Sequence, residues 1–235
     1  METEQQMENE NNKKTLFPVN PDSKHSVIIF FIALTIIIGI TFLMWAIGFV
    51  KHNAVKQSLV LLIIVAYTAV AVGAMFLTGQ QIQLLPSKNK LWLQILIGVA
   101  IAALLCLIIG ILPILCGTSL IGSHTDMSVG QILLAAMQDI LFVGIGEEIV
   151  FRGYIQNQFT VWLKKCKWLA PLIAALLFGL WHVINGSIAQ VIFTTLIGCV
   201  FGYAKHYIKY CSLLSVITAH GLYDFSLVIL TCFML

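Results

Sequence analysis

Two adjacent carboxylates and the only arginine of the chain lie inside a long apolar stretch. They are Glu147, Glu148 and Arg152, in a hydrophobic run that begins near Gln131. A charge at bilayer depth costs at least ~2.5–3.5 kcal/mol, so charges clustered this closely indicate a function rather than chance. The chemistry open to such a cluster is proton transfer, ion pairing or metal binding.

Spacing gives the two glutamates different tasks. Glu148 and Arg152 are four residues apart, so they can form an ion pair along one face of a helix. Glu147 points about 100° away from Glu148 on the same helix and is free to serve elsewhere. The sequence therefore predicts one carboxylate for structure and one for chemistry.

Further polar groups interrupt the later apolar runs. His182 follows Phe178 by four residues, which places an aromatic ring beside the imidazole, and His220 and Asp224 are again four residues apart. Counted from the nearest lysine-bearing ends, Glu147 and these three ionisable residues lie roughly 12–21 Å deep. Ionisable groups at one depth on three helices predict a shared, hydrated cavity.

Three classes of function could use such a cavity. In a hydrolase, a carboxylate and an imidazole remove a proton from water. In a zinc hydrolase, His182, His220 and Asp224 would ligate Zn²⁺ and leave a position open for water. A proton-coupled transporter also favours ionisable groups in mid-membrane, but the sequence has no inverted repeat of the kind many transporters show. No other cofactor is expected.

The elements that position these groups are membrane helices. Hydrophobic residues make up 60% of the 235 residues and charged residues 10%, and the mean hydropathy is +0.97. This composition predicts an all-α, polytopic membrane helix bundle of about seven transmembrane helices, or eight with a short or re-entrant helix. The expected spans are 27–50, 57–78, 91–115, 131–158, 168–185, 187–206 and 212–234. Residues 1–26 form a polar, disordered cytoplasmic tail, 27–130 the N-terminal transmembrane helices and 131–235 a catalytic helical core.

Lysine placement predicts the orientation. With the N-terminus inside, ten lysines fall in cytoplasmic segments and only Lys51 and Lys56 fall outside, as the positive-inside rule requires. The lysines are dispersed, so a nucleic-acid partner is excluded. The six cysteines have no C-x-x-C spacing and are read as packing residues.

Three motifs, in this order and each on an apolar helix, resemble the signature of the CPBP family. These are the CAAX-protease and bacteriocin-processing membrane proteins, also called the Abi family, which are related to the type II CAAX prenyl endopeptidase. The resemblance covers about residues 131–228. It rests on Glu147-Glu148-x-x-x-Arg152, Phe178-x-x-x-His182 and His220-x-x-x-Asp224.

The resemblance implies a role for each residue. Glu147, assisted by His182, would be the general base that activates water, while His220 and Asp224 would stabilise the oxyanion or bind metal. The family's last position is Asn or Asp. An ionised Asp224 cannot donate a hydrogen bond, so it must be protonated, orient His220 or ligate a metal. Three supporting residues shape and charge-balance the site: Glu148, Arg152 and Phe178.

The expected activity is endoproteolysis inside a bacterial cell membrane. The partners are the lipid bilayer and a peptide or membrane-protein substrate, such as a secreted peptide precursor or a self-immunity target. The main alternative is a non-catalytic membrane scaffold or bacteriocin self-immunity protein that keeps the fold. A proton-coupled transporter is the third choice.

Overall fold

The computed structural model describes residues 22–51, 53–80, 90–121, 123–184 and 187–234. Within these ranges the chain is helical and contains no strand, which confirms the all-α bundle. Most of the predicted tail, residues 1–21, and the predicted Asn185-Gly186 turn lie outside the described residues. The helices are α2 (Lys24–Ile47), α3 (Asn53–Leu77), α4 (Leu91–Leu105), α5 (Leu112–Leu115), α6 (Val129–Gln138), α7 (Gly144–Glu148), α8 (Gln156–Trp162), α9 (Leu169–Trp181), α10 (Ile188–Tyr207) and α11 (Leu213–Phe233).

Short segments of wider or tighter helix join several of these elements into longer ones. Three are π-helical: η3 (Cys106–Ile111), η4 (Asp139–Val143) and η5 (Ile149–Ile155). With them, α4 continues into α5, and α6 runs through α7 to α8 as one helix over Val129–Trp162. Such π-helical turns inside α-helices are frequent at functional sites.

Among the described residues, six helices are long and apolar enough to cross a membrane, and they match six of the seven predicted spans. The exception is the span predicted at 168–185. Its α-helix, α9, is 13 residues long and tightens into the 3₁₀ turn η6 (His182–Ile184). At 1.5 Å per residue, α9 is only about 20 Å long, shorter than the ~30 Å hydrocarbon core. The length of the apolar run did not reveal that the α-helix ends just before His182.

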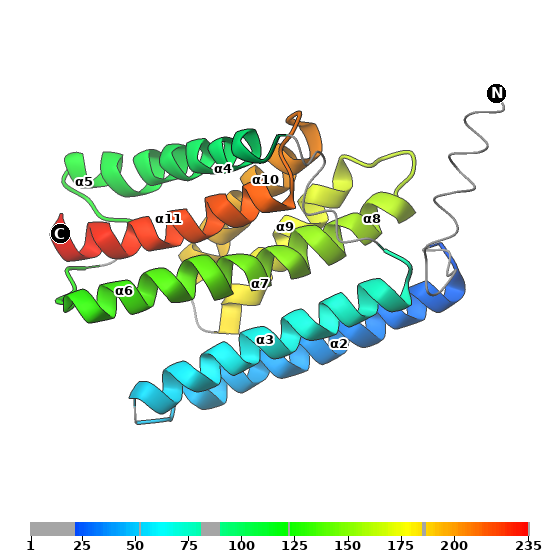
Figure 1. Ribbon diagram of the computed structural model, residues 1–235, viewed down its shortest axis with the longest axis horizontal. Coiled ribbons are helices and arrows are strands. Elements are labelled where there is room, and N and C mark those ends of the chain that lie inside the picture. Colours follow the sequence, from blue (N-terminus) through cyan, green and yellow to red (C-terminus); the bar gives the residue numbers. More distant parts are fainter. Residues whose placement is uncertain (1–21, 52, 81–89, 122, 185–186, 235) are drawn as a thin grey trace.

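The two ends of the bundle differ in charge (Figure 1). Toward the right of the view lie the starts of α2 and α4, the connection from α8 to α9 and the end of α10. The connection from α2 to α3 lies at the left. The first end, which we call the lysine-rich end, carries Lys24, Lys90, Lys164, Lys165, Lys167, Lys205 and Lys209. The lysine-poor end carries Lys51 and Lys56.

The helix Val129–Trp162 carries Glu147, Glu148 and Arg152, and we call it the site helix. It lies between two apolar clusters. On one side, Val150 and Phe151 pack into a cluster contributed mainly by α2, α3 and α9. On the other, Ile145 and Ile149 pack against a cluster from α4, α10 and α11. This helix therefore has little freedom to rotate, which fixes the direction of each of its side chains.

Small residues bring α11 against the site helix at van der Waals distance. A Cβ added to Gly144 would lie 2.9 Å from the backbone nitrogen of Gly221, and a Cβ on Gly221 would lie 2.7 Å from the Cα of Ile140. Neither position has room for a larger side chain. Because the two backbones touch here, Glu148 of α7 and His220 of α11 come within hydrogen-bond reach.

Candidate active site

The two glutamates of α7 face different surroundings, as their spacing predicts. Glu147 lines a cavity and is 9% exposed, whereas Glu148 is wholly buried. The Oε2 atom of Glu147 has no hydrogen-bond partner among the described residues. A buried carboxylate oxygen without a hydrogen-bond partner is rare, and it belongs here to a residue that lines a cavity able to hold water or substrate.

Glu148 is the centre of a buried ionic cluster. Its Oε1 atom accepts hydrogen bonds from Nη1 of Arg152 at 2.8 Å and from Nδ1 of His220 at 2.7 Å. The first contact is the predicted ion pair along one helix face. The second joins residues 72 positions apart in the sequence, and no local pattern predicted it.

The guanidinium of Arg152 also contacts α10 and two aromatic rings. Its Nη2 donates to the carbonyl oxygen of Gly198 on α10 at 3.2 Å. The guanidinium carbon lies 4.4 Å from the ring centre of Phe178 and 5.4 Å from that of Phe201. Cation–π contacts of this kind gain strength when water is excluded. The side chain of Arg152 thereby ties α10 and α9 to the site helix.

His220 stands between carboxylates on both sides of its ring. Nδ1 donates to Glu148, while Nε2 lies 3.2 Å from Oδ2 of Asp224 and 3.8 Å from Oε2 of Glu147. The face of the ring lies 5.4 Å from the ring of Phe201, centre to centre. His220 therefore connects the buried cluster to the carboxylates of the cavity.

His182 presents one ring nitrogen to the cavity. Its Nδ1 donates to the carbonyl oxygen of Phe178 at 2.9 Å, four residues earlier in α9. In a neutral imidazole the other nitrogen, Nε2, is then an acceptor. The ring also packs edge-on against Phe178 at 4.9 Å, the aromatic neighbour that the spacing predicts.

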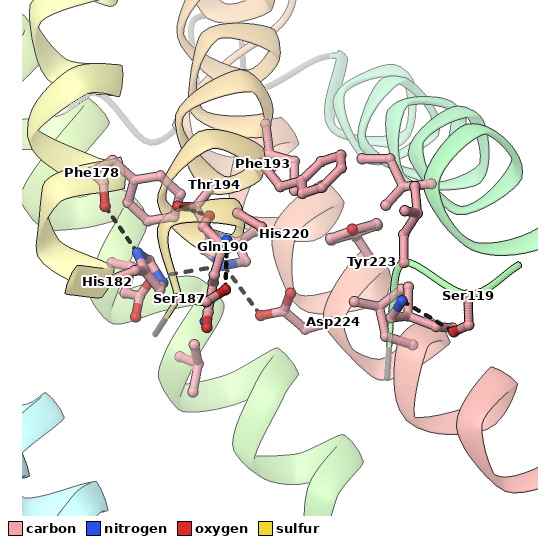
Figure 2. A pocket seen from close by; sticks show the side chains of 18 residues that line it. Ser119, Phe178, His182, Ser187, Gln190, Phe193, Thr194, His220, Tyr223 and Asp224 are labelled. Atoms are coloured by element: carbon pink, nitrogen blue, oxygen red, sulfur yellow. Dashed lines mark hydrogen bonds and ion pairs between the residues drawn. The ribbon is translucent and has the colours of Figure 1, made fainter. Parts of the chain in front are cut away.

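All four residues predicted to be catalytic line one cavity of about 740 Å³. Figure 2 shows His182, His220 and Asp224 directed into this shared space, and Glu147 also lines it. Glu148 and Arg152 lie behind the wall, in the packed interior. The structure thus brings together the residues that the sequence placed on three separate helices.

Several residues of the cavity were missed by the sequence analysis. They are uncharged, and all but Tyr223, which lies in the middle of α11, belong to connections or to the first turns of α10, where serine, threonine and glutamine are ordinary. The only available signals were the position of Ser187 as a helix N-cap and of Tyr223 beside Asp224. The set comprises Ser119, Ser187, Gln190, Phe193, Thr194 and Tyr223.

Lys205, which the prediction counted among the lysines of the cytoplasmic segments, makes contacts that the sequence did not predict. It lies in α10, and its Nζ donates to the carbonyl oxygen of Arg152 at 3.0 Å and to Oδ1 of Asn157 at 2.9 Å. Arg152 belongs to the π-helical segment η5, where the regular i to i+4 hydrogen bonds are interrupted. The ammonium group therefore satisfies a carbonyl of the site helix itself.

The donor set does not fit the zinc site that was one alternative. Among the described ranges, no three His, Cys, Asp or Glu side chains are placed so that they could hold a metal ion. Nδ1 of His220 donates to Glu148, which leaves Nε2, 3.2 Å from Oδ2 of Asp224, as the one nitrogen of this ring that could reach a metal.

A family comparison covers this part of the chain. Residues 129–226 match the family model described as type II CAAX prenyl endopeptidase Rce1-like. The region is Rce1-like. It extends from the start of α6 into α11 and includes every residue of the cluster and the four candidate catalytic residues.

The Rce1-like region agrees with the resemblance drawn from the three motifs, all of which lie within the matched residues. Since the described residues include six apolar helices long enough to cross a bilayer, the chain is an integral, multi-pass membrane protein. No significant match was found among curated proteins or among solved structures.

Proposed function

We propose that the chain is an intramembrane endopeptidase in which Glu147 activates water. The observation that carries this proposal is the position of Glu147, which lines the cavity and whose Oε2, without a hydrogen-bond partner among the described residues, lies 3.8 Å from Nε2 of His220. A carboxylate next to a cavity and to two imidazoles has the groups that general acid–base hydrolysis needs.

The reaction divides among three side chains. The proton of water passes to Glu147, with Nε2 of His182 orienting the water as an acceptor. The water oxygen forms a bond to the peptide carbonyl carbon, and the carbonyl π electrons move to the oxygen. That oxyanion accepts a hydrogen bond from Nε2–H of His220. The tetrahedral intermediate then breaks its C–N bond, and the leaving nitrogen takes the proton from Glu147.

The remaining residues hold His220 in the form that can donate. Nδ1–H of His220 donates to Glu148, so a second proton on Nε2 gives the ring a positive charge that the neighbouring carboxylates balance. Asp224, 3.2 Å from Nε2, orients that side of the ring. Arg152 and Phe178 keep Glu148 in place. Asp224 thus acts through His220 and needs no proton of its own.

The substrate class is a peptide bond in a peptide precursor or a membrane-anchored protein segment. The matched family is named for prenylated CAAX proteins. Apart from the four catalytic candidates, the cavity is lined by aliphatic, aromatic and uncharged polar side chains, which suit an extended, largely uncharged peptide, with or without a prenyl group.

The test is a peptide comparison by mass spectrometry. Membranes that contain the wild type are set against membranes with an equal amount of Glu147→Gln, each with and without a chelator. We expect cleavage products only with the wild type, and we expect them to persist in chelator. Loss of cleavage with chelator and recovery with zinc would contradict the metal-free mechanism. No difference between the two proteins, over a broad peptide set, would favour the scaffold or immunity alternative.

A further inference from the structure

The three long helices of the site, Val129–Trp162, α10 and α11, hold most of their buried residues on one side of the catalytic residues. In the helix Val129–Trp162, no residue of α6 or η4 is buried, whereas most residues of α7 and η5 are. In α10 the first buried residue is Ile197. In α11, all but one of the buried residues lie at or before Tyr223. The packed side is the one toward the lysine-rich end.

The cavity extends in the opposite direction. Its wall includes Ser119 and Ile121 from the connection between α5 and α6, and Ser187 and Gln190 from the start of α10. The connection between α5 and α6 lies at the lysine-poor end (Figure 1), and the start of α10 is the end of that helix away from Lys205. None of its lining residues belongs to the lysine-bearing connections 163–168 or 208–212.

The side toward the lysine-rich end is closed by buried side chains. Behind His220, the space is filled by the Glu148–Arg152 pair, by Phe201 and by Leu213, each of which is at most 1% exposed. Lys205 reaches into the same region to bond the carbonyl of Arg152. A substrate that approached from this end would have to displace an ion pair and its aromatic cover.

Charge then assigns the two ends to the two sides of a membrane. Seven of the lysines in the described ranges lie at the closed end, against Lys51 and Lys56 at the open end. An excess of Lys and Arg marks the cytoplasmic side. The open end is therefore extracytoplasmic.

We propose that this site takes its substrate from the extracytoplasmic side, as an extended segment of an exported peptide or of a protein already placed in the membrane. This rests on the proposed proteolytic function. Ser187, Gln190 and Thr194 at the entrance can hydrogen-bond a peptide main chain, and Phe193 and Tyr223 can contact apolar side chains. The substrate is a chain that has crossed or entered the bilayer, not one presented by the cytosol.

The first part of the test fixes the orientation with cysteines that the chain already contains. Cys116 follows α5 at the lysine-poor end, Cys166 lies between α8 and α9 at the lysine-rich end, and both are exposed. Two variants are compared, Cys166→Ser and Cys116→Ser, with a membrane-impermeant maleimide. In intact cells, we expect labelling at Cys116, and at Cys166 only after permeabilisation. The reverse pattern would overturn the proposal. Burial raises the pKa of Cys211 to about 11, so this thiol contributes little background.

The second part asks whether the cavity itself is reached from that side. Gln190→Cys is prepared in the Cys116→Ser background and labelled in the same way. We expect labelling in intact cells, beyond that of the background protein. Labelling that requires permeabilisation would contradict entry from the extracytoplasmic side, whatever the enzymatic activity.

The third part separates this proposal from the proteolytic function. A peptide mixture is added outside sealed right-side-out vesicles and outside inside-out vesicles, each with the wild type or with Glu147→Gln. Cleavage by the wild type in right-side-out vesicles alone is expected. Cleavage in inside-out vesicles alone would overturn the direction of entry and leave the protease intact. Absence of cleavage from either side, together with labelled Gln190→Cys, would reject the proteolytic function and retain the accessible cavity.

Discussion

The two halves of the site helices solve different problems. Toward the lysine-rich end, α7, η5 and the first part of α11 bury an ion pair, two aromatic rings and several glycine contacts in a closely packed interior. Toward the lysine-poor end, the helix Val129–Trp162, α10 and α11 line the cavity, which carries uncharged polar groups there. The catalytic candidates lie at the boundary between the two halves.

This difference indicates why so many charges lie within the bilayer. Glu148 and Arg152 do not meet substrate, yet they fix His220 from behind through a fully buried carboxylate. Glu147 and Asp224 meet the cavity and remain available for chemistry. Preorganised groups held by a rigid second layer lose less energy to reorganisation during the reaction.

The strongest test of the boundary is Glu147→Gln. An amide cannot take a proton from water, so we expect the cleavage rate to fall by about 10²–10⁴-fold, the usual contribution of a general base. Because Glu147 lies at the cavity wall, the melting temperature of the variant should differ little from that of the wild type. Peptide cleavage and thermal unfolding in detergent measure the two quantities.

Glu148→Gln is the matched variant on the packed side. It removes the negative charge that faces Arg152 and His220, so we expect a lower melting temperature and less folded protein. A Glu148→Gln protein that is inactive while fully folded and abundant would show that Glu148 acts by positioning His220 and not by stabilising the fold, and one that is abundant and fully active would contradict both roles.

Arg152→Met tests the packed half alone. It leaves the buried carboxylate of Glu148 without its main partner, and breaking a buried pair in this way costs about 3–5 kcal/mol. We expect most of the protein to be lost from the membrane fraction. Lys209→Met, at an exposed position, is the control and should change stability by less than about 0.5 kcal/mol. Equal abundance of the two variants would argue against a close-packed charged interior.

The glycines extend the comparison to the backbone. Gly144→Ala and Gly221→Ala place a methyl group within 3 Å of a neighbouring backbone, so each should destabilise the fold by about 1–3 kcal/mol. Gly130→Ala lies in the open half, where nothing is within 4 Å, and should be neutral or slightly stabilising. Thermal unfolding of the three variants checks the order. Similar melting temperatures for all three would mean that α11 and the site helix can move apart.

The smallest effect is expected for Lys205→Met. The substitution removes the donor to the carbonyl of Arg152, and an unsatisfied carbonyl costs about 1–2 kcal/mol. Lys167→Met, exposed at the same end, is the control. A melting temperature equal to that of the control would show that the π-helical segment η5 does not depend on the ammonium group.

The sequence predicts best what the bilayer and helix periodicity dictate. Long apolar runs locate six of the helices within a few residues, because the thickness of a membrane sets a minimum length. Spacings of four residues correctly predict the contacts of Glu148 with Arg152 and of His220 with Asp224, because such residues share a helix face.

Contacts between helices are harder to obtain from the sequence. The bond from His220 to Glu148 and that from Arg152 to Gly198 depend on how helices cross, which no local pattern encodes. The short α9 escaped prediction because an apolar run does not distinguish an α-helix from a 3₁₀ turn. The residues at the cavity entrance, such as Ser187 and Gln190, were not predicted because serine and glutamine near helix ends carry no distinctive signal.

The π-helical segments on either side of the glutamates have a consequence for how this protein can change length. A π-helical turn holds more residues than an α-helical one, so deletion of one residue from Ile149–Ile155 would restore ordinary winding. Because the wide turn absorbs the extra residue, the helix beyond such a deletion would keep its orientation, and Gln156 would still face the carbonyl of Gly202 on α10. A deletion from the ordinary α-helix Gln156–Trp162 would instead rotate every residue beyond it by about 100°. Natural variants of this chain should therefore accept the loss of one residue within Ile149–Ile155 more readily than a loss within Gln156–Trp162.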